Sequence, residues 1–468
     1  APFPFDSPPA GKDSPAVPAA AAPPAPFGTG RVFRFWVPLA ATWLMMAVEG
    51  PFLAALIARL AEPQYNLAAF GVALSFALLL EAPVIMIMAA ATALVRDRDS
   101  LRRLRRFTYA LNAALTVATA ALLAPPVFDA VAGSLMGLPQ PVAHLTYGSL
   151  ALLLPWPAAI GYRRLYQGVL IRHGLTRRVG LGTAVRLAGM SLTAVTLFHL
   201  GIAGAYLAAA SLSAGVLVEA AASRWMCAGA LRELGNLRGR QDLSYPAIAG
   251  FYYPLALSSV LTLGVHPIIS YFLAQGQAAV ESLAVFPVVR SLVFLFSCLG
   301  LSYQEVGIAL LGERAEGYAP LRRFALGLGL VTALGLAGIA FSPLGDVWYR
   351  QVSGLPLELA AFCPLPTRIL ALVPLLSVYL SFQRSVYMAA RRTGAVTAAT
   401  AVDVGAIIAV LYLGTRFLEV PGIQVAAVAL VAGRSAGSLW LRLPRAAMLR
   451  GLVDSRGSGG LRSVKRKK

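Results

Sequence analysis

The chain alternates between long runs of apolar residues and short connections that contain charged, Pro and Gly residues. A hydrocarbon core about 30 Å thick needs around 20 apolar residues per helix, and the chain contains twelve runs of about that length. This pattern predicts an all-α polytopic membrane protein with both chain ends on one side, because the number of spans is even. The expected spans are residues 33–57, 66–95, 105–127, 143–170, 179–200, 202–227, 248–273, 281–311, 322–343, 359–387, 394–414 and 421–442.

The composition supports membrane insertion. Of the 468 residues, 58% are hydrophobic and only 13% are charged, and the mean hydropathy is +0.71, which excludes a soluble domain with a polar surface. A formal charge of +20 would suggest nucleic acid in a soluble protein. Here the basic residues lie between apolar runs, so we expect membrane lipids and no nucleic acid as partners.

The charge is strongly asymmetric across the predicted spans. One set of connections and tails carries 33 Lys and Arg residues, whereas the opposite set carries only Arg59, Arg350 and Arg416. Cytosolic loops of membrane proteins are enriched in Lys and Arg. We therefore expect both termini in the cytosol of a multi-pass protein of the plasma membrane, here a bacterial inner membrane.

The ends of the chain and its cysteines offer little chemistry. Residues 1–30 are rich in Pro and Ala and lack a signal-peptide pattern, so we expect a disordered tail. Residues 444–468 form a second, basic tail that can touch anionic lipid heads. The three cysteines lack metal-ligand spacing, and we interpret them as packing residues; they are Cys227, Cys298 and Cys363.

A duplication organises the spans. The segment FWVPLA at 35–40 matches FYYPLA at 251–256 with an offset of 216, and LRRF occurs at both 104–107 and 321–324. Further matches in the same order predict a bundle over 31–228, a linker over 229–247 and a second bundle over 248–443. Each bundle has six spans, so the halves form a parallel repeat about an axis along the membrane normal, an architecture typical of transporters that rock about a central site.

With two such halves, each opening on an aromatic-x-x-Pro-Leu segment, the chain resembles the multidrug/oligosaccharidyl-lipid/polysaccharide (MOP) exporter superfamily, which includes the MATE multidrug exporters and lipid-linked precursor flippases. Segments such as FYYPLALSSVLTLGVHPII and YQGVLIRHGLTRRVG are most similar to the progressive ankylosis protein type. The resemblance implies a V-shaped pair of bundles, a cleft lined by the first two helices of each half, and efflux powered by proton or sodium antiport.

Acidic residues inside the spans are candidates for ion coupling. Glu49 and Glu81 lie in the middle of the first and second spans, where a carboxyl group is costly and usually faces a cavity or a partner. Such a group can exchange a proton or bind sodium, and Glu49 matches the depth of an acidic residue in the first helix of MATE exporters. The alternative is a structural ion pair with Arg. Asp403 and Glu305 are further candidates, although Glu305 lies near the cytosolic end of its span.

Arginines inside the spans are candidates for substrate binding. A guanidinium group offers a two-pronged donor to phosphate or carboxylate, and Arg290 is the best placed, unless it pairs with Glu49 or Glu81. Arg186 is repeat-equivalent to Asp403, so the two can form a charge pair across the pseudo-axis or two halves of a site. The other intramembrane arginines, Arg368 and Arg434, can instead snorkel or pair within their own bundle.

These observations favour a secondary exporter of a small or amphipathic solute, with Arg favouring an anionic one. The closest alternative is a flippase for a lipid-linked glycan precursor. A membrane-embedded glycan polymerase or ligase is disfavoured because the outer connections are short and the sequence has no clustered catalytic set. We expect no enzyme, no cofactor other than a coupling proton or sodium ion, and a monomer.

Overall fold

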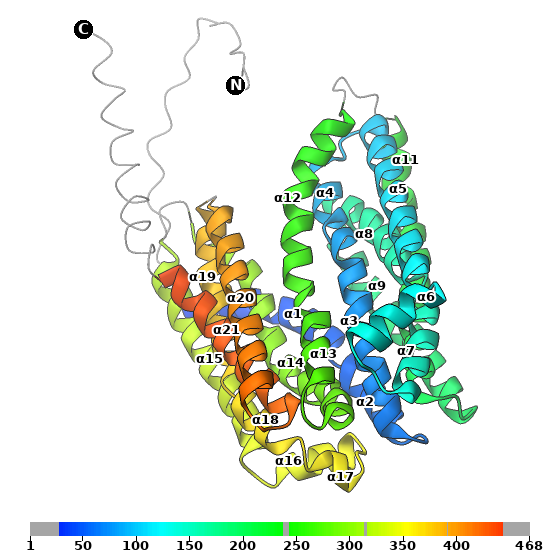
Figure 1. Cartoon of the computed structure of the whole chain (residues 1–468). Helices are drawn as coiled ribbons and strands as arrows, with labels where there is room; N and C mark the ends of the chain where they lie inside the picture. Colours follow the sequence, from blue (N-terminus) through cyan, green and yellow to red (C-terminus); the bar gives the residue numbers. More distant parts are fainter. Residues whose placement is uncertain (1–27, 237–242, 313–315, 391, 443–468) are drawn as a thin grey trace, which may run out of the picture.

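A computed structural model describes residues 28–236, 243–312, 316–390 and 392–442. Within these ranges the chain is helical and contains no strand beyond one isolated bridge between Gln277 and Pro421. Figure 1 shows two groups of long helices side by side. The helices of the N half are α1 (Thr29–Ala47), α2 (Glu49–Ala58), α3 (Pro63–Ile85), α4 (Ile87–Leu94), α5 (Arg98–Leu122), α6 (Pro125–Phe128), η1 (Asp129–Leu135), α7 (Gln140–Leu152), α8 (Trp156–Arg172), α9 (Thr176–His199), α10 (Gly204–Met226) and α11 (Ala228–Asn236). Those of the C half are α12 (Tyr245–Leu263), α13 (Val265–Gln275), α14 (Ala279–Leu310), α15 (Tyr318–Ala340), α16 (Leu344–Asp346), η2 (Val347–Val352), α17 (Leu357–Ala360), α18 (Pro364–Leu370), α19 (Val373–Ala389), α20 (Thr393–Phe417) and α21 (Gly422–Arg442).

The helices occupy all twelve expected ranges, and the chain is a multi-pass membrane protein. By length and composition, ten helical segments are able to cross a membrane, and an eleventh is added if α5 and the bent segment 125–135 form one span. The twelfth expected range, 143–170, is filled by α7 and α8, which are interrupted at 153–155. The expected tails lie outside the described residues apart from 28–30, of which 29–30 already belong to α1. The expected linker is helical up to Asn236, and 237–242 lie outside the described residues.

Proline sets the break in the first span of each half. Pro51 follows the interruption between α1 and α2 at Val48, and its repeat equivalent, Pro267, follows the interruption between α12 and α13 at Gly264. A proline ring lacks the N–H for the helical hydrogen bond and clashes with the carbonyl four residues earlier. The same residue type at the same register therefore divides both spans at the same place.

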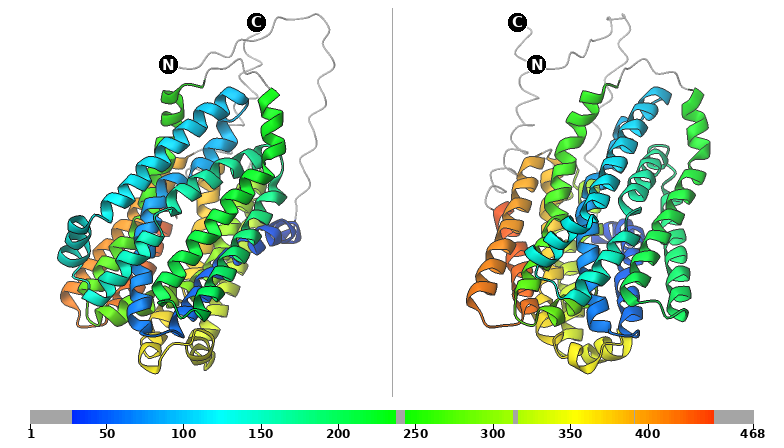
Figure 2. Two further views of the ribbon diagram at one scale, coloured as in Figure 1. Left: turned by 90° about the vertical axis from the view of Figure 1, so that its right-hand side faces the viewer. Right: turned by 45° about the vertical axis from the view of Figure 1, so that its right-hand side comes forward.

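The first helix of each half packs against the other half. α1 contacts α14 and α15 of the C half, and α12 contacts α3 and α4 of the N half. In Figure 1, α12 runs beside the N-half helices, and in Figure 2 the dark-blue α1 lies against the yellow-green helices of the C half.

Repeat-equivalent aromatic residues anchor these exchanged helices. The Trp36 indole donates to Ser302 Oγ at 2.9 Å and to the Leu299 carbonyl at 3.4 Å. Its equivalent, the Tyr252 hydroxyl, donates to the carbonyl of Pro83, and Pro83 is itself equivalent to Leu299. Because both donors are buried, each would leave an unsatisfied polar group without this bond.

A second reciprocal set of hydrogen bonds joins the halves at the end of the molecule that contains α16 and α17, which we call the distal end. Arg59 donates to the carbonyls of Gln351 and Val352 at 2.7 and 3.0 Å. Gln275, the repeat equivalent of Arg59, donates to the carbonyls of Leu135 and Met136 in the matching segment of the N half, at 3.3 and 3.0 Å. We call these two contacts the distal clamp.

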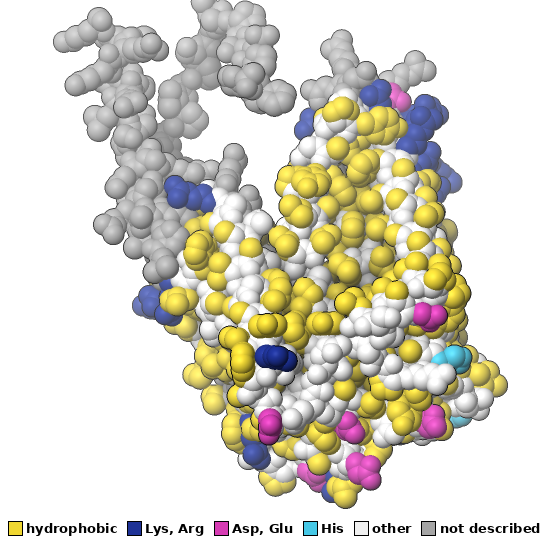
Figure 3. Space-filling model, viewed as in Figure 1, with side chains coloured by type: hydrophobic (Ala, Val, Ile, Leu, Met, Phe, Trp, Pro, Cys, Tyr) yellow, Lys and Arg dark blue, Asp and Glu magenta, His cyan; other side chains and the backbone are white. Residues whose placement is uncertain are grey.

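The opposite end, which we call the Arg-rich end, carries exposed arginines at 98–106 of α5, together with 177–178 and 322–323. In Figure 3 basic side chains gather at this end and acidic ones at the distal end. The surface is hollowed between α12 and α20 toward the Arg-rich end (Figure 3). The halves are therefore closed at the distal end and diverge toward the Arg-rich end.

The distal clamp makes a local prediction. Arg59→Ala is expected to speed amide exchange in 347–355 of the C half, whereas Gln275→Ala is expected to speed it in 129–138 of the N half. Loss of hydrogen bonds worth about 1–2 kcal/mol corresponds to roughly 5- to 30-fold faster exchange. Hydrogen–deuterium exchange with mass spectrometry measures both segments in one experiment.

Arg416→Ala is the matched control, because Arg416 is an exposed arginine in the last turn of α20. Faster exchange in 347–355 for Arg416→Ala as well, or unchanged exchange there for Arg59→Ala, would contradict the clamp.

Candidate functional site

The main candidate site lies between the two halves. A cavity of about 380 Å³ is lined by α1, α2 and α3 of the N half and by α12, α13 and α14 of the C half, with side chains from α8, α9 and α10. The first two helices of each half therefore line the cleft, as the resemblance implied. Four of the predicted site residues face this cavity: Glu49, Glu81, Arg186 and Arg290.

A second cavity of about 260 Å³ lies within the C half, between α12–α14 and α18–α21. It is lined by Arg290, Arg434 and Asp403 among the predicted residues, and also by Arg384 and His266. The two cavities share Leu263, His266, Arg290 and Phe294. The Arg290–His266 pair, joined at 3.1 Å, therefore stands at the boundary between them.

The remaining two predicted residues line neither cavity. Glu305 is exposed on α14. Arg368 is also exposed, donates to the Ala340 carbonyl at 3.2 Å, lies over the Phe341 ring and lines a small distal pocket. Neither position offers a group to the central cavities, so we place both outside the candidate site.

In the N half the buried charges compensate one another. Arg186 forms an ion pair with Glu49 and lies 3.6 Å from Glu219, which also pairs with Arg163. Gln167 donates to the other oxygen of Glu219 at 3.0 Å. Two carboxylates thus face two guanidinium groups, all of them buried. The cost of desolvating these charges is offset by the pairing and by the additional hydrogen bond.

Glu81 differs from the other acids of the N half. It is buried and accepts a hydrogen bond from the Trp156 indole. No ion pair of the described residues includes it, whereas Glu49 and Glu219 both have arginine partners. A buried carboxyl group without a paired cation is stable only when it is neutral or holds a small cation.

Two pairings that the sequence left open as alternatives do not form. Arg186 and Asp403 do not pair across the pseudo-axis: Arg186 binds Glu49, and Asp403 binds Arg434 at 2.7 Å. Arg290 does not pair with Glu49 or Glu81 but donates to His266. Each arginine instead binds a partner on a neighbouring helix of its own half: Glu49 for Arg186, Asp403 for Arg434 and His266 for Arg290.

Three arginines expected in cytosolic connections lie instead inside helices. Arg163 and Arg164 belong to α8, and Arg384 belongs to α19. Arg163 is buried against Glu219, and Arg384 lines the C-half cavity. All three positions fall inside expected spans, 143–170 and 359–387. These span boundaries are the sequence signal that could have identified them as intramembrane arginines. The charge asymmetry between the two ends persists without them.

Within the described residues, no group of His, Cys, Asp and Glu side chains has the arrangement of a metal site.

The N-half network makes a stability prediction. Arg163→Met leaves Glu219 buried with fewer compensating groups and is expected to lower the free energy of unfolding by about 3–5 kcal/mol. The double variant Arg163→Met/Glu219→Leu is expected to recover most of that loss, because both charges are then absent. Thermal unfolding in one detergent measures both variants.

Arg177→Met is the control, because this arginine is exposed in the first turn of α9. A double variant no more stable than Arg163→Met would show that Glu219 is not the group that Arg163 compensates.

Comparison with known proteins gives a fold. No family model and no curated protein matches the chain. An inward-facing multidrug resistance MATE family transporter of the MOP superfamily matches with a TM-score of 0.70 and 14% identity, covering 87% of this chain and 96% of that one. The lipid II flippase MurJ in an inward closed conformation matches at 0.66 and 12%, over 89% and 90%. An outward-facing MATE family transporter matches at 0.61 and 15%, over 90% and 96%.

These similarities cover nearly the whole described chain and most of each solved structure. The resemblance to the progressive ankylosis type is a finer assignment and stays a prediction. The chain thus has the fold shared by MATE transporters of the MOP superfamily and the lipid II flippase.

Proposed function

We propose that the chain is a secondary active transporter, an exporter or flippase that works by alternating access. One observation carries this proposal: the central cavity is built by equivalent helices of two repeat-related halves, and the distal clamp closes its distal end. Two similar bodies around one site can expose that site to either side by rocking. The solved structures of this fold are named as transporters and as a flippase, which supports transport rather than catalysis.

The described conformation fits one half of such a cycle. The halves diverge toward the Arg-rich end, and the inward-facing MATE transporter is more similar to the chain than the outward-facing one. If the Arg-rich end is cytosolic, as the positive-inside rule predicts, the cavity faces the cytosol. An exporter loads its solute in this state.

Glu81 is our candidate for the coupling residue. Glu49 is already compensated by Arg186, whereas Glu81 lines the same cavity without an ion-pair partner. Uptake of a proton or a sodium ion would neutralise Glu81 at little cost to its neighbours. Glu49 and Arg186 would then hold α2 against α9 during the cycle.

Alternating access can be tested without knowing the solute. Ser291 of α14 lines the central cavity, and Ser291→Cys, on a background without the three native cysteines, provides a single reporter. A charged, membrane-impermeant thiol reagent applied to oriented vesicles is expected to label it from both sides. Ser211→Cys is the control: Ser211 is fully buried and lines neither cavity, so labelling is expected from neither side. Labelling of Ser291→Cys from one side only would contradict rocking, and labelling together with ion conductance would indicate a pore.

The coupling assignment has its own test in the same assay. A sodium or proton gradient is expected to change the labelling rate of Ser291→Cys severalfold, because binding at the coupling residue shifts the balance of the two states. Glu81→Gln is expected to abolish this response. Glu305→Gln, which alters an exposed acid on α14, is expected to retain it. A full response in Glu81→Gln would remove the assignment.

A further inference from the structure

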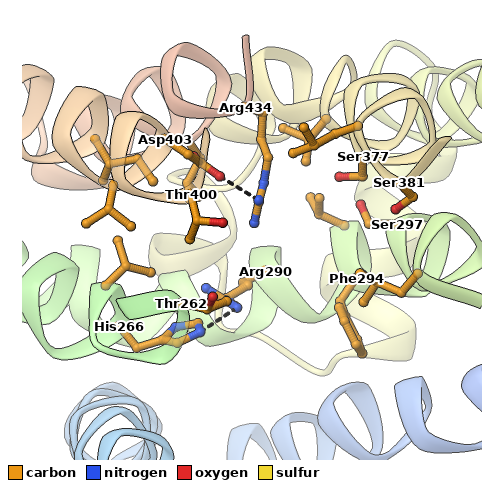
Figure 4. Close-up of a pocket in the computed structure, with 18 of the residues that line it drawn as sticks. Thr262, His266, Arg290, Phe294, Ser297, Ser377, Ser381, Thr400, Asp403 and Arg434 are labelled. Atoms are coloured by element: carbon orange, nitrogen blue, oxygen red, sulfur yellow. Dashed lines mark hydrogen bonds and ion pairs between the residues drawn. The ribbon is translucent and has the colours of Figure 1, made fainter. Parts of the chain in front are cut away.

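The C-half cavity differs chemically from the cavity between the halves. Three arginines line it, Arg290 on α14, Arg384 on α19 and Arg434 on α21, together with one carboxylate, Asp403 on α20. In Figure 4 the side chain of Arg434 extends into the open space toward Arg290, whose guanidinium group lies beside His266. Hydroxyl groups surround the same space, including those of Ser377 and Thr400.

Within the part of the chain that the structure describes, only one of the three guanidinium groups forms an ion pair. Arg434 binds Asp403 at 2.7 Å, whereas Arg384 donates to the Thr400 hydroxyl at 3.2 Å and Arg290 donates to His266 Nε2 at 3.1 Å. Because an arginine side chain can only donate, His266 accepts through an unprotonated nitrogen and is therefore neutral. The lining of the cavity carries an excess of two positive charges.

The repeat shows that this excess is not a general property of the fold. In the N half Arg163 and Arg186 pair with Glu219 and Glu49, and Arg164, which donates to the Met88 sulfur, is matched in number by the unpaired acid Glu81. Uncompensated charge at membrane depth is expensive, and it is retained where a ligand supplies the opposite charge. Within the described residues the hydroxyl of Ser297 in the cavity lining has no hydrogen-bond partner, and the buried Nε of Arg384 has none either, as is also true of the Nε atoms of Arg163, Arg164 and Arg186 in the N half.

We propose that the C-half cavity binds an oxyanion with two negative charges, a phosphate or dicarboxylate group, either as a free solute or as the headgroup of a lipid. Arg290 and Arg384 are its main contacts, since both are free of acidic partners and can each offer a two-pronged donor. Asp403 orients Arg434 and cancels one positive charge. The proposal rests on the proposed transport function, because it names the class of substrate that the transporter carries.

Calorimetry on the full-length protein in nanodiscs tests the site directly. Inorganic phosphate and succinate are expected to bind one saturable site and to compete, each at least tenfold more tightly than acetate. Arg290→Gln and Arg384→Gln are each expected to weaken this binding tenfold or more, and Arg416→Gln, an exposed arginine outside the site, is expected to leave it unchanged. If phosphatidate added to the nanodisc displaces phosphate, the natural ligand is a lipid headgroup. If phosphate binding is unaffected by phosphatidate, the natural ligand is a free solute.

A variant that adds a negative charge tests the site without the risk that removing an arginine unfolds the protein. Ser377→Asp adds a carboxylate to the cavity lining without removing an arginine, and it is expected to weaken succinate binding tenfold while retaining the melting temperature. Equal binding of acetate and succinate, or wild-type affinity in folded Arg290→Gln and Arg384→Gln, overturns the proposal. Two-sided labelling of Ser291→Cys without dianion binding would refute this site alone, whereas dianion binding with one-sided labelling would refute the transport function.

Discussion

The structure depends on hydrogen bonds that the repeat makes twice between its two halves. Trp36 and Tyr252 hold the exchanged first helices, and Arg59 and Gln275 close the distal end. Each donor is repeat-equivalent to its counterpart, and the backbone acceptors lie in matching segments of the two halves. Apart from the Ser302 hydroxyl, which accepts from Trp36, the acceptors are main-chain carbonyls, and those contacts survive a change of the accepting residue's side chain. The halves also pack against each other along α3 and α14, and the central cavity lies between them.

Within this symmetric frame the buried charges are asymmetric. The N half contains as many intramembrane acids as arginines, with Glu49 and Glu219 in ion pairs, whereas in the C-half cavity Arg290 and Arg384 form no ion pair within the described residues. Position-by-position divergence explains this: Arg290 is equivalent to Leu74, and Asp403 is equivalent to Arg186. The backbone contacts preserve the geometry, while substitutions of a few interior side chains give each half its own chemistry. We infer that ion coupling and substrate recognition have been divided between the halves in this way.

Sequence periodicity predicted the helices well, because long apolar runs are specified locally, and the offset of 216 predicted the equivalence of the halves. It did not predict the exchange of α1 and α12, since apolar faces fit several neighbours equally well. Charge pairing was predicted least reliably. Arg186 and Asp403 were correctly placed inside spans, yet their partners depend on helix rotation and on distances of a few ångströms. The distal clamp was also invisible, because its acceptors are backbone carbonyls that carry no sequence signal.

The exchange of the first helices also affects how the protein is made. Trp36 finds its partner 266 residues later in the chain, and Arg59 finds one 292 residues later. At a synthesis rate of about 5–20 residues per second, this separation amounts to tens of seconds. Contacts so distant in sequence form late, after much of the chain has been ordered. The first span is therefore inserted well before α14 exists, and during biogenesis it lies against lipid rather than in its final place.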